Sequence, residues 1–235
     1  MKAKIREQNF KPSFWGLFVN PFYFARRGLY KHISELAPSL KGRILDVGCG
    51  SKPYRTCFNA SEYIGLEIEG RNKQADRHYN GKTFPFKDGE IDSIFTSQVL
   101  EHVFNPDEFL SEMNRVLKDG GMLLLTVPFV WDEHEQPFDY ARYSSFGLRH
   151  LLERHGFEIK EHRKSMNDVR VVFQMINAYL TKTVFTKNGM LNMLLTLAFV
   201  VPFNIMGEIA GRILPCNNDL YLDNIILARK RRSLK

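Results

Sequence analysis

Cysteine is scarce in this chain of 235 residues, which contains only three, at positions 49, 57 and 216. An odd number of cysteines without the spacing of metal ligands predicts neither a disulfide framework nor a zinc cluster. The scattered histidines show no metal spacing either, so we expect no bound metal. A reducing compartment, the cytoplasm, is therefore the default expectation.

The chain also lacks internal repeats and low-complexity tracts. Charged and polar residues interrupt the segment that follows the N-terminus, and we therefore expect no secretory signal. Hydrophobic residues make up 44% of the chain and include 19 Phe, which is enough to fill a core. This composition excludes a collagen, a disulfide miniprotein and a disordered tail, and the length fits one medium domain with an appendage.

Acidic residues are few at the two ends of the chain. Residues 1–43 contain nine Lys or Arg and two Asp or Glu, and residues 229–235 contain five and none. Residues 44–228 contain 19 Lys or Arg and 24 Asp or Glu, so the middle of the chain is mildly acidic although the net charge of the whole chain is +7. With no recognisable RNA-binding module, nucleic acid is a poor candidate partner, and the basic ends favour an anionic membrane surface or an anionic lipid-linked acceptor.

Charge is absent from the twenty residues between Asn188 and Gly207. This length would permit a membrane span, but Asn192, Asn204 and Pro202 dilute the apolar run. A single span would also place the strands before and after it on opposite sides of the bilayer. Two alternatives remain open: a buried or lid-like helical pair, and a helix that lies in a membrane surface.

From Ile44 onward, short apolar runs alternate with amphipathic segments, which predicts a mostly parallel sheet covered by helices. Strands are expected over 43–47, 62–67, 75–79, 91–96, 122–128, from 157 and over 220–228. Helices are expected over 106–118, with Asn105 as N-cap, and from Ser144 or Ser145 to His155. We expect a basic helical segment (1–40), a core (41–165), an apolar helical insertion (166–218), and a final strand with a basic tail (219–235).

The strongest local signal is the run ILDVGCG at 44–50, a strand that leads into a G-x-G turn. Glycines there let the backbone approach a ligand closely. Pro53 stands where a dinucleotide fingerprint needs its third glycine, which disfavours NAD. Glu67 lies nineteen residues after Gly48, where a carboxylate can bind both hydroxyls of a ribose. The pattern indicates a nucleoside without a pyrophosphate.

Further runs follow in order: FPF at 84–86 before DG at 88–89, IDSI at 91–94, VLEHV at 99–103 and RVLKDGG at 115–121. With LDVGCG, they resemble the class I S-adenosylmethionine-dependent methyltransferases over about residues 40–165. The resemblance implies a Rossmann-like, doubly wound, seven-stranded and mostly parallel sheet, with the helical apolar insertion before the last strand. It also implies S-adenosyl-L-methionine as the cofactor.

The same resemblance assigns cofactor-binding residues. Four residues of the first motif would hold the methionine part of the cofactor: Asp46, Gly48, Cys49 and Gly50. Glu67 would bind the ribose, Asn80 the adenine amino group, and Ser97 with Gln98 would line the sulfonium side. Glu101 and His102 would begin a helix beside the cofactor, and we give them a structural role.

The segment 128–143 is expected to hold the acceptor, because ligands of open α/β sheets bind beyond the carboxyl ends of the strands. It is dense in acidic, basic and aromatic side chains. His134, between Glu133 and Glu135, is the candidate catalytic base for a hydroxyl acceptor. The expected substrate-binding residues are Glu133, Asp139, Arg142 and Tyr143, with Asp139 and Arg142 orienting the acceptor.

The expected function is methyl transfer to oxygen or nitrogen of a small molecule or a glycan or lipid-linked sugar. The 128–143 segment resembles a subset of the family associated with bacterial surface-polysaccharide and natural-product biosynthesis. The main alternative is a lipid or quinone methyltransferase at the membrane. An RNA methyltransferase and an inactive methyltransferase-like binding module are further alternatives, and the sequence does not indicate the oligomeric state.

Overall fold

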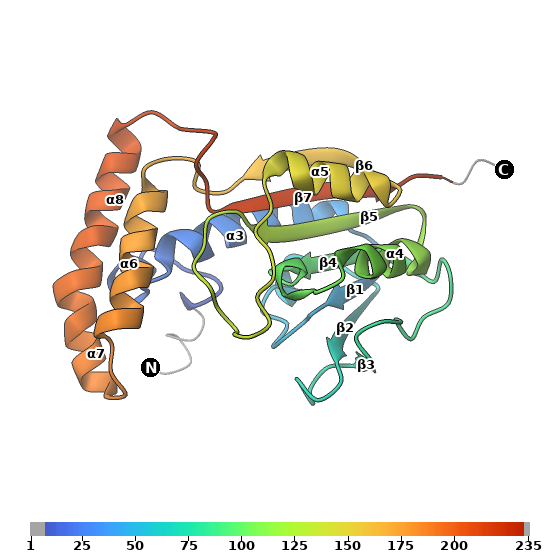
Figure 1. Ribbon diagram of the computed structural model, residues 1–235, viewed down its shortest axis with the longest axis horizontal. Helices are drawn as coiled ribbons and strands as arrows, with labels where there is room; N and C mark the ends of the chain where they lie inside the picture. The colour runs from blue at the N-terminus through green and yellow to red at the C-terminus, as the bar shows by residue number, and fades with distance from the viewer. Residues whose placement is uncertain (1–7, 233–235) are drawn as a thin grey trace. The chain divides into compact units, whose positions relative to one another are not determined.

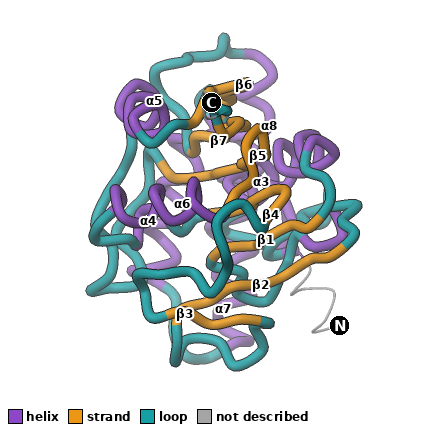
Figure 2. Tube along the Cα trace, turned by 90° about the vertical axis from the view of Figure 1, so that its right-hand side faces the viewer, coloured by secondary structure: helices purple, strands orange, loops and turns teal. Residues whose placement is uncertain are grey.

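Seven strands form one sheet in the order β3-β2-β1-β4-β5-β7-β6, which Figure 2 shows from β3 at the bottom to β6 at the top. The structure is a computed structural model that describes residues 8–232. The strands are β1 (Arg43–Val47), β2 (Glu62–Ile68), β3 (Arg77–Tyr79), β4 (Ile91–Ser97), β5 (Leu117–Pro128), β6 (Phe157–Lys164) and β7 (Asp223–Lys230). The pairs β1–β2, β1–β4, β2–β3 and β4–β5 are parallel, and the Rossmann-like fold predicted from the sequence is confirmed.

The described residues divide into two compact units. The sheet unit comprises residues 32–129, 133–163 and 224–232, and the helical unit comprises 8–31, 130–132 and 164–223. The expected basic N-terminal segment and most of the expected apolar insertion thus belong to the same unit. Residues 1–7 of that segment and residues 233–235 of the expected basic tail lie outside the described residues.

In the sheet unit, helices α4 (Pro106–Val116) and α5 (Ser145–Arg154) and the short turns η2 (Arg55–Cys57) and η3 (Leu100–His102) follow strands of the sheet. Apolar side chains of β1, β4 and β5 pack with those of α4 and α5 in one buried core. Ser144 caps α5, because its side chain accepts a hydrogen bond from Gly147 N at 3.2 Å. Asn105 occupies the predicted N-cap position of α4, but its side chain makes no capping hydrogen bond.

Several predicted boundaries were wrong. The helix expected to run to Lys118 ends at Val116, and β5 begins at Leu117, before the Asp119-Gly120-Gly121 run that was expected to precede it. Leu117 is fully buried and pairs with Ile91, while the register with β4 shifts between Ile91 and Ser93. Gly120 and Gly121 therefore lie in a bulge of β5. The last strand begins at Asp223 rather than Leu220.

The helical unit contains α2 (Gly16–Val19), most of α3 (Tyr23–Leu36, followed by η1, Ala37–Ser39), α6 (Arg170–Val184), α7 (Gly189–Leu195), the π-helical turn η4 (Thr196–Val200) and α8 (Val201–Ile213). The last three form one continuous helix, Gly189–Ile213, beside α6 (Figure 1). It is long and apolar enough to cross a membrane, yet only 28% of its most apolar 18-residue stretch is buried. The structure therefore does not show the buried helical pair that the sequence left open.

The two sides of this long helix differ, and polar side chains lie on its inward side. Its buried residues are Thr196, Val200, Val201, Asn204 and Gly207. Asn204 Nδ2 donates to the carbonyl oxygens of Leu17 (2.9 Å) and Asn20 (3.2 Å). The outward side is apolar and exposed, and it includes Met190, Met193, Leu194, Leu197, Ile205, Met206, Ile209 and Ile213. We call these eight residues the outer apolar face.

Candidate active site

The turn after β1 depends on two glycines. Gly48 has φ +71° and Gly50 has φ +47°, conformations that residues with a side chain rarely adopt. A Cβ atom on Gly48 would lie 2.4 Å from Cγ2 of Val99, so the backbone there approaches the next loop too closely for any side chain. The amides of Gly48 and Cys49 donate to Leu66 O on β2. These two hydrogen bonds therefore hold the turn in place beside β2, at the carboxyl edge of the sheet.

Glu67, near the end of β2, lies beside this turn. Its side chain is nearly buried, with 9% of the residue exposed, and its Oε2 accepts a hydrogen bond from Gly50 N at 3.2 Å. Its Oε1 accepts from Ile68 N at 3.1 Å. The carboxylate is thus fixed against the glycine turn, as a group that must meet a ribose held over that turn should be.

A pocket of about 450 Å³ opens above the glycine turn, within the sheet unit. Among the predicted cofactor residues, Gly48, Gly50, Glu67 and Gln98 line it. Pockets of this size accept small molecules of a few hundred daltons. The glycine cradle and the adjacent fixed carboxylate fit the methionine and ribose parts of S-adenosylmethionine.

The other predicted cofactor residues do not line this pocket. Asp46 is buried and accepts a hydrogen bond from Tyr63 Oη at 2.7 Å, and burial raises the pKa of its carboxyl to about 7. Burial also raises the pKa of the Cys49 thiol to about 12. Asn80 is exposed, and its Oδ1 accepts from the amides of Lys82 and Thr83. Ser97 Oγ lies 2.8 Å from Thr126 Oγ1 on β5.

His102, which was expected beside the cofactor, lines the pocket. Sequence reasoning missed several other residues that line it, namely Ser51, Ile68, Arg71, Asn72, Gln74, Tyr79, Val99, Val103 and Glu135. Asn72 Nδ2 donates to Gly50 O at 2.5 Å, and Arg71 lies 3.7 Å from Glu135 Oε2 and over the ring of Phe138. Arg71 and Asn72 follow β2 directly, at the carboxyl edge where ligands bind. That position is the signal that could have identified them.

In the expected acceptor segment, the structure brings His134, Asp139 and Arg142 together. Arg142 binds both oxygens of Asp139 at 2.7 Å, and His134 N donates to Asp139 Oδ2 at 2.9 Å. The hydrogen bonds from Arg142 lower the pKa of Asp139 to about 2. Asp139 and Arg142 thus hold the segment in place, and neither lines the pocket.

The two remaining predicted substrate residues lie apart from this group. The Glu133 carboxylate accepts a hydrogen bond from Gln136 Nε2 at 3.1 Å, within the exposed part of the segment. Tyr143 packs against the core of the sheet unit, and burial raises its pKa to about 12. The ring of Tyr143 therefore anchors the segment 128–143 to the core of the sheet unit.

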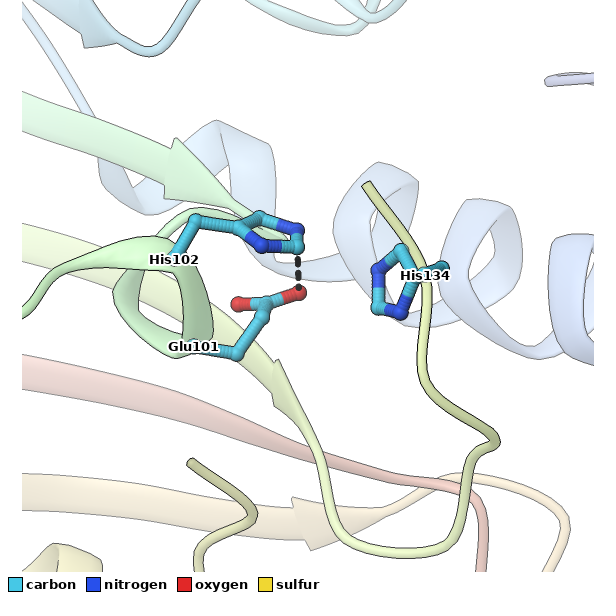
Figure 3. A group of neighbouring side chains, drawn as sticks. All are labelled: Glu101, His102 and His134. Atoms are coloured by element: carbon cyan, nitrogen blue, oxygen red, sulfur yellow. Dashed lines mark ion pairs between the residues drawn. The ribbon is translucent and has the colours of Figure 1, made fainter. Parts of the chain in front are cut away.

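Glu101, His102 and His134 form a cluster at the edge of the pocket (Figure 3). Each offers one ligand atom, and these three atoms lie within 4.8 Å of one another. Glu101 is fully buried, and its Oε1 lies 3.8 Å from Nε2 of His102. We had assigned Glu101 and His102 a structural role, and in the structure both lie beside the candidate base, His134.

Comparison with known proteins agrees with this geometry. A family model described as a methyltransferase domain matches residues 22–162. A Mycolicibacterium smegmatis protein named "Probable S-adenosylmethionine-dependent methyltransferase" is 29% identical over 164 residues, which cover 62% of this chain and 63% of that protein. The chain thus spans less than two thirds of the length of this relative.

Solved structures share the fold at low identity. Phosphoethanolamine N-methyltransferase 2 of Haemonchus contortus, in complex with S-adenosyl-L-methionine, superposes with a TM-score of 0.55 at 16% identity, over 99% of this chain and 58% of that one. The [4+2]-cyclase SpnF superposes with a TM-score of 0.56 at 20% identity, over 87% and 82%. Because the family model covers more than half of the chain, the protein belongs to the methyltransferase domain family, as a class I member whose cofactor is S-adenosylmethionine.

Proposed function

We propose that the protein transfers the methyl group of S-adenosylmethionine to a hydroxyl of a small polar acceptor, a sugar or a lipid-linked sugar. The observation that carries this proposal is the pocket that joins the cofactor cradle of Gly48, Gly50 and Glu67 to the side chain of His102. In such a transfer the acceptor oxygen forms a bond to the methyl carbon as the carbon–sulfur bond breaks, and S-adenosylhomocysteine leaves. The protein must align the two atoms and exclude water.

An acceptor hydroxyl must also lose its proton. The side chains of Glu101, His102 and His134 cluster at the edge of the pocket, and we place this step at that cluster, with His134 as the candidate base. Arg71 and Glu135, which face each other across the pocket rim, supply the charged groups that a polar acceptor can bind. Polar and charged side chains at the rim support a hydroxylated acceptor over an apolar one.

The outer apolar face supports a membrane location. In a helix that contacts lipid, small and polar side chains gather at the protein side and apolar ones face outward, as they do here. The exposed Phe14 and Trp15 precede and begin the turn at α2, whose Leu17 carbonyl oxygen accepts the hydrogen bond from Asn204. Exposed aromatic rings of this kind favour the lipid interface.

The charge of the helical unit suits an anionic bilayer. Its described residues include nine Lys or Arg and five Asp or Glu. Basic residues next to an apolar helix strengthen binding to anionic lipid. We therefore propose that the enzyme is cytoplasmic and docks on the inner face of the membrane through the helical unit, where a lipid-linked acceptor is available.

The membrane part is tested by flotation of the full chain with vesicles of phosphatidylcholine, with and without phosphatidylglycerol. The wild type should float with the anionic vesicles. A Leu197→Glu/Ile209→Glu variant should float several-fold less, because it places two charges on the outer apolar face. Phe146→Glu, which changes an exposed ring on α5, is the control and should behave as the wild type. A wild type that floats with neither vesicle overturns the membrane proposal and leaves methyl transfer untouched.

The chemistry is tested with S-adenosylmethionine that carries a radiolabelled methyl group. Calorimetry should show that the protein binds the cofactor. The label should pass to a free sugar or to a sugar linked to a polyprenyl carrier. Transfer to a hydroquinone would instead support the lipid or quinone alternative, which the apolar helix also favours. A protein that binds no S-adenosylmethionine would overturn the proposal.

A further inference from the structure

A second pocket, of about 160 Å³, lies within the helical unit. It shares no lining residue with the cofactor pocket, and its lining consists of Pro12, Ser13, Phe14, Leu17, Tyr23, Arg27, Glu208 and Arg212. A water molecule takes up about 30 Å³ in the liquid, so this pocket has room for a group of several heavy atoms. We call it the arginine pocket.

Three arginine side chains surround one carboxylate at the arginine pocket. Arg27 Nη1 donates to both oxygens of Glu208 at 3.1 Å, and Arg212 Nη2 lies 3.4 Å from Glu208 Oε1. Arg170 Nη1 lies 3.8 Å from Glu208 Oε2, while other nitrogens of Arg170 donate to Asp168. These three arginines and two carboxylates carry a formal net charge of +1. The electrostatic field of this group therefore favours an anion.

The groups that line the arginine pocket suit a phosphate. The guanidinium group offers parallel N–H donors that match phosphate oxygens. The side chains of Arg27 and Arg212 are 41% and 73% exposed, and the 3.4 Å contact of Arg212 is longer than an ordinary N–H···O hydrogen bond. Both guanidinium groups can therefore turn toward a ligand.

A buried hydroxyl adds a further donor. Tyr23 lines the arginine pocket although only 3% of the residue is exposed. Its Oη accepts a hydrogen bond from Arg27 Nη1 at 3.2 Å, so the phenol hydrogen can be donated to a phosphate oxygen. Burial raises the pKa of Tyr23, which keeps this hydrogen in place at neutral pH. The pocket thus combines two cationic forks with a neutral donor.

The arginine pocket lies at the edge of the outer apolar face. Residues three positions apart on an α-helix are separated by about 60° around its axis. Glu208 therefore neighbours Ile205 on the surface of α8, and Arg212 neighbours Ile209. The exposed ring of Phe14 also lines the pocket. An anion bound here is next to side chains that we place in the bilayer, which is where the phosphate groups of lipids lie.

We propose that the arginine pocket binds the phosphate group of an anionic membrane lipid. The inference rests on the proposed membrane docking and adds a specific site to it. Side chains of the outer apolar face enter the bilayer, while Arg27 and Arg212 bind a lipid phosphate at its surface. Basic pockets beside helices that contact lipid bind headgroups in this way. General attraction to a negative surface would involve every basic residue of the helical unit, whereas a phosphate site depends on these two.

The first test is flotation of the full chain with phosphatidylcholine vesicles that contain phosphatidic acid. The wild type should float with them. Arg27→Gln and Arg212→Gln should each weaken binding about tenfold, because each removes charge-assisted hydrogen bonds to the phosphate. Lys187→Gln is the control, since it removes one exposed charge of the helical unit outside the pocket, and it should bind as the wild type does. Equal losses in all three variants overturn the site.

A substitution by lysine separates phosphate recognition from charge alone. Arg212→Lys keeps the positive charge but loses the paired N–H donors, so its binding should lie between those of the wild type and Arg212→Gln. Wild-type binding by Arg212→Lys would show that charge alone matters and would overturn the site. If Arg27→Gln does not fold, Arg212→Gln carries the test, because its side chain is mostly exposed.

The second test uses soluble probes and calorimetry, without a membrane. Dihexanoyl phosphatidic acid should bind more tightly than glycerol 3-phosphate, because its acyl chains can contact the apolar side chains beside the arginine pocket. Equal affinities would indicate a site for free phosphate and overturn the lipid assignment. A wild type that binds neither probe overturns the site altogether.

The two tests also separate this inference from the proposed function. A wild type that floats equally well with and without Arg27 and Arg212 keeps the membrane docking and overturns the phosphate site. A wild type that floats with no vesicle, yet binds dihexanoyl phosphatidic acid through Arg212, supports the site and overturns the docking. Neither result changes the assignment of methyl transfer, which calorimetry with S-adenosylmethionine tests on the same samples.

Discussion

Asn177 Nδ2 donates a hydrogen bond of 2.9 Å to Asn204 Oδ1, and both side chains are fully shielded from solvent between α6 and α8. Asn204 Nδ2 in turn donates a hydrogen bond to the carbonyl oxygen of Leu17 in α2. A third buried amide, that of Gln174, accepts from Ala25 N and donates to Pro21 O. The helical unit is thus joined internally by amides, while apolar side chains cover its outer face.

Asn204→Leu should destabilise the helical unit. The change leaves Asn177 Nδ2 and the carbonyl oxygen of Leu17 buried without this partner, and each such group costs about 1–3 kcal/mol. We expect a loss of about 2–4 kcal/mol in the free energy of unfolding, measured by urea denaturation. Met206→Ala, on the outward side of the same helix, should change it by less than about 1 kcal/mol. Equal effects of the two variants would contradict the described polarity.

Glu67→Ala should weaken S-adenosylmethionine binding. Hydrogen bonds to a charged group contribute about 1.5–3 kcal/mol, which corresponds to about 10–100-fold in Kd measured by calorimetry. Glu69→Ala is the control, because Glu69 is exposed and does not line the pocket. Unchanged affinity in Glu67→Ala would exclude the ribose role of this carboxylate.

Gly48→Ala should disrupt the glycine turn for two separable reasons. The methyl group would meet Val99 at 2.4 Å, and φ +71° is strained for alanine. We expect a loss of about 2 kcal/mol or more in stability, together with weaker cofactor binding. Gly70→Ala has the same strain (φ +83°) but open space around its Cβ, so it isolates the backbone contribution. Equal losses of stability in Gly48→Ala and Gly70→Ala would show that contact with Val99 does not add to the backbone strain.

Asp139→Asn should reduce the acid sensitivity of the protein. Because the folded pKa (about 2) lies below the ordinary 3.8, the ionised carboxylate stabilises the fold fully above pH 3.8, and this contribution is lost as the pH falls toward 2. The shift corresponds to about 2.5 kcal/mol. Urea denaturation at pH 7 and pH 3 should show a smaller difference for Asp139→Asn than for the wild type. Asp219→Asn, at an exposed position, is the control and should lose as much stability between pH 7 and pH 3 as the wild type does. If Asp139→Asn also loses as much as the wild type, the Asp139 carboxylate does not cause the acid sensitivity.

The sheet was predictable because its signals are local. Strands β1, β2 and β4 begin where the sequence placed them, since each buried apolar run is bounded by a turn or a polar residue. The start of β5 was not predictable. A pair of glycines normally ends a helix, but Gly120 and Gly121 lie inside a bulge of β5. Only the pairing of Leu117 with Ile91 shows that the strand has already begun.

The pocket lining was predictable where a motif supplies it with its own backbone or its last side chain, as at Gly48, Gly50 and Glu67. Tyr79 lines the pocket from the end of β3, and no motif along the chain marks it. Asn204 was counted as a polar interruption of an apolar run, an argument against a membrane span. Its side chain is turned inward by its hydrogen bonds with α2 and α6, so it does not interrupt the outer apolar face.

Ser165 and Asp223 are paired at the base of the helical insertion. Ser165 N donates to Asp223 O at 2.9 Å, Leu222 N donates to Ser165 O at 3.0 Å, and Ser165 Oγ donates to Asp223 Oδ2 at 2.6 Å. The two ends of the segment 166–222 are therefore adjacent, and a short turn could join Ser165 to Asp223 at little cost in loop entropy. The length of this segment is thus not constrained by the strands β6 and β7 that it connects.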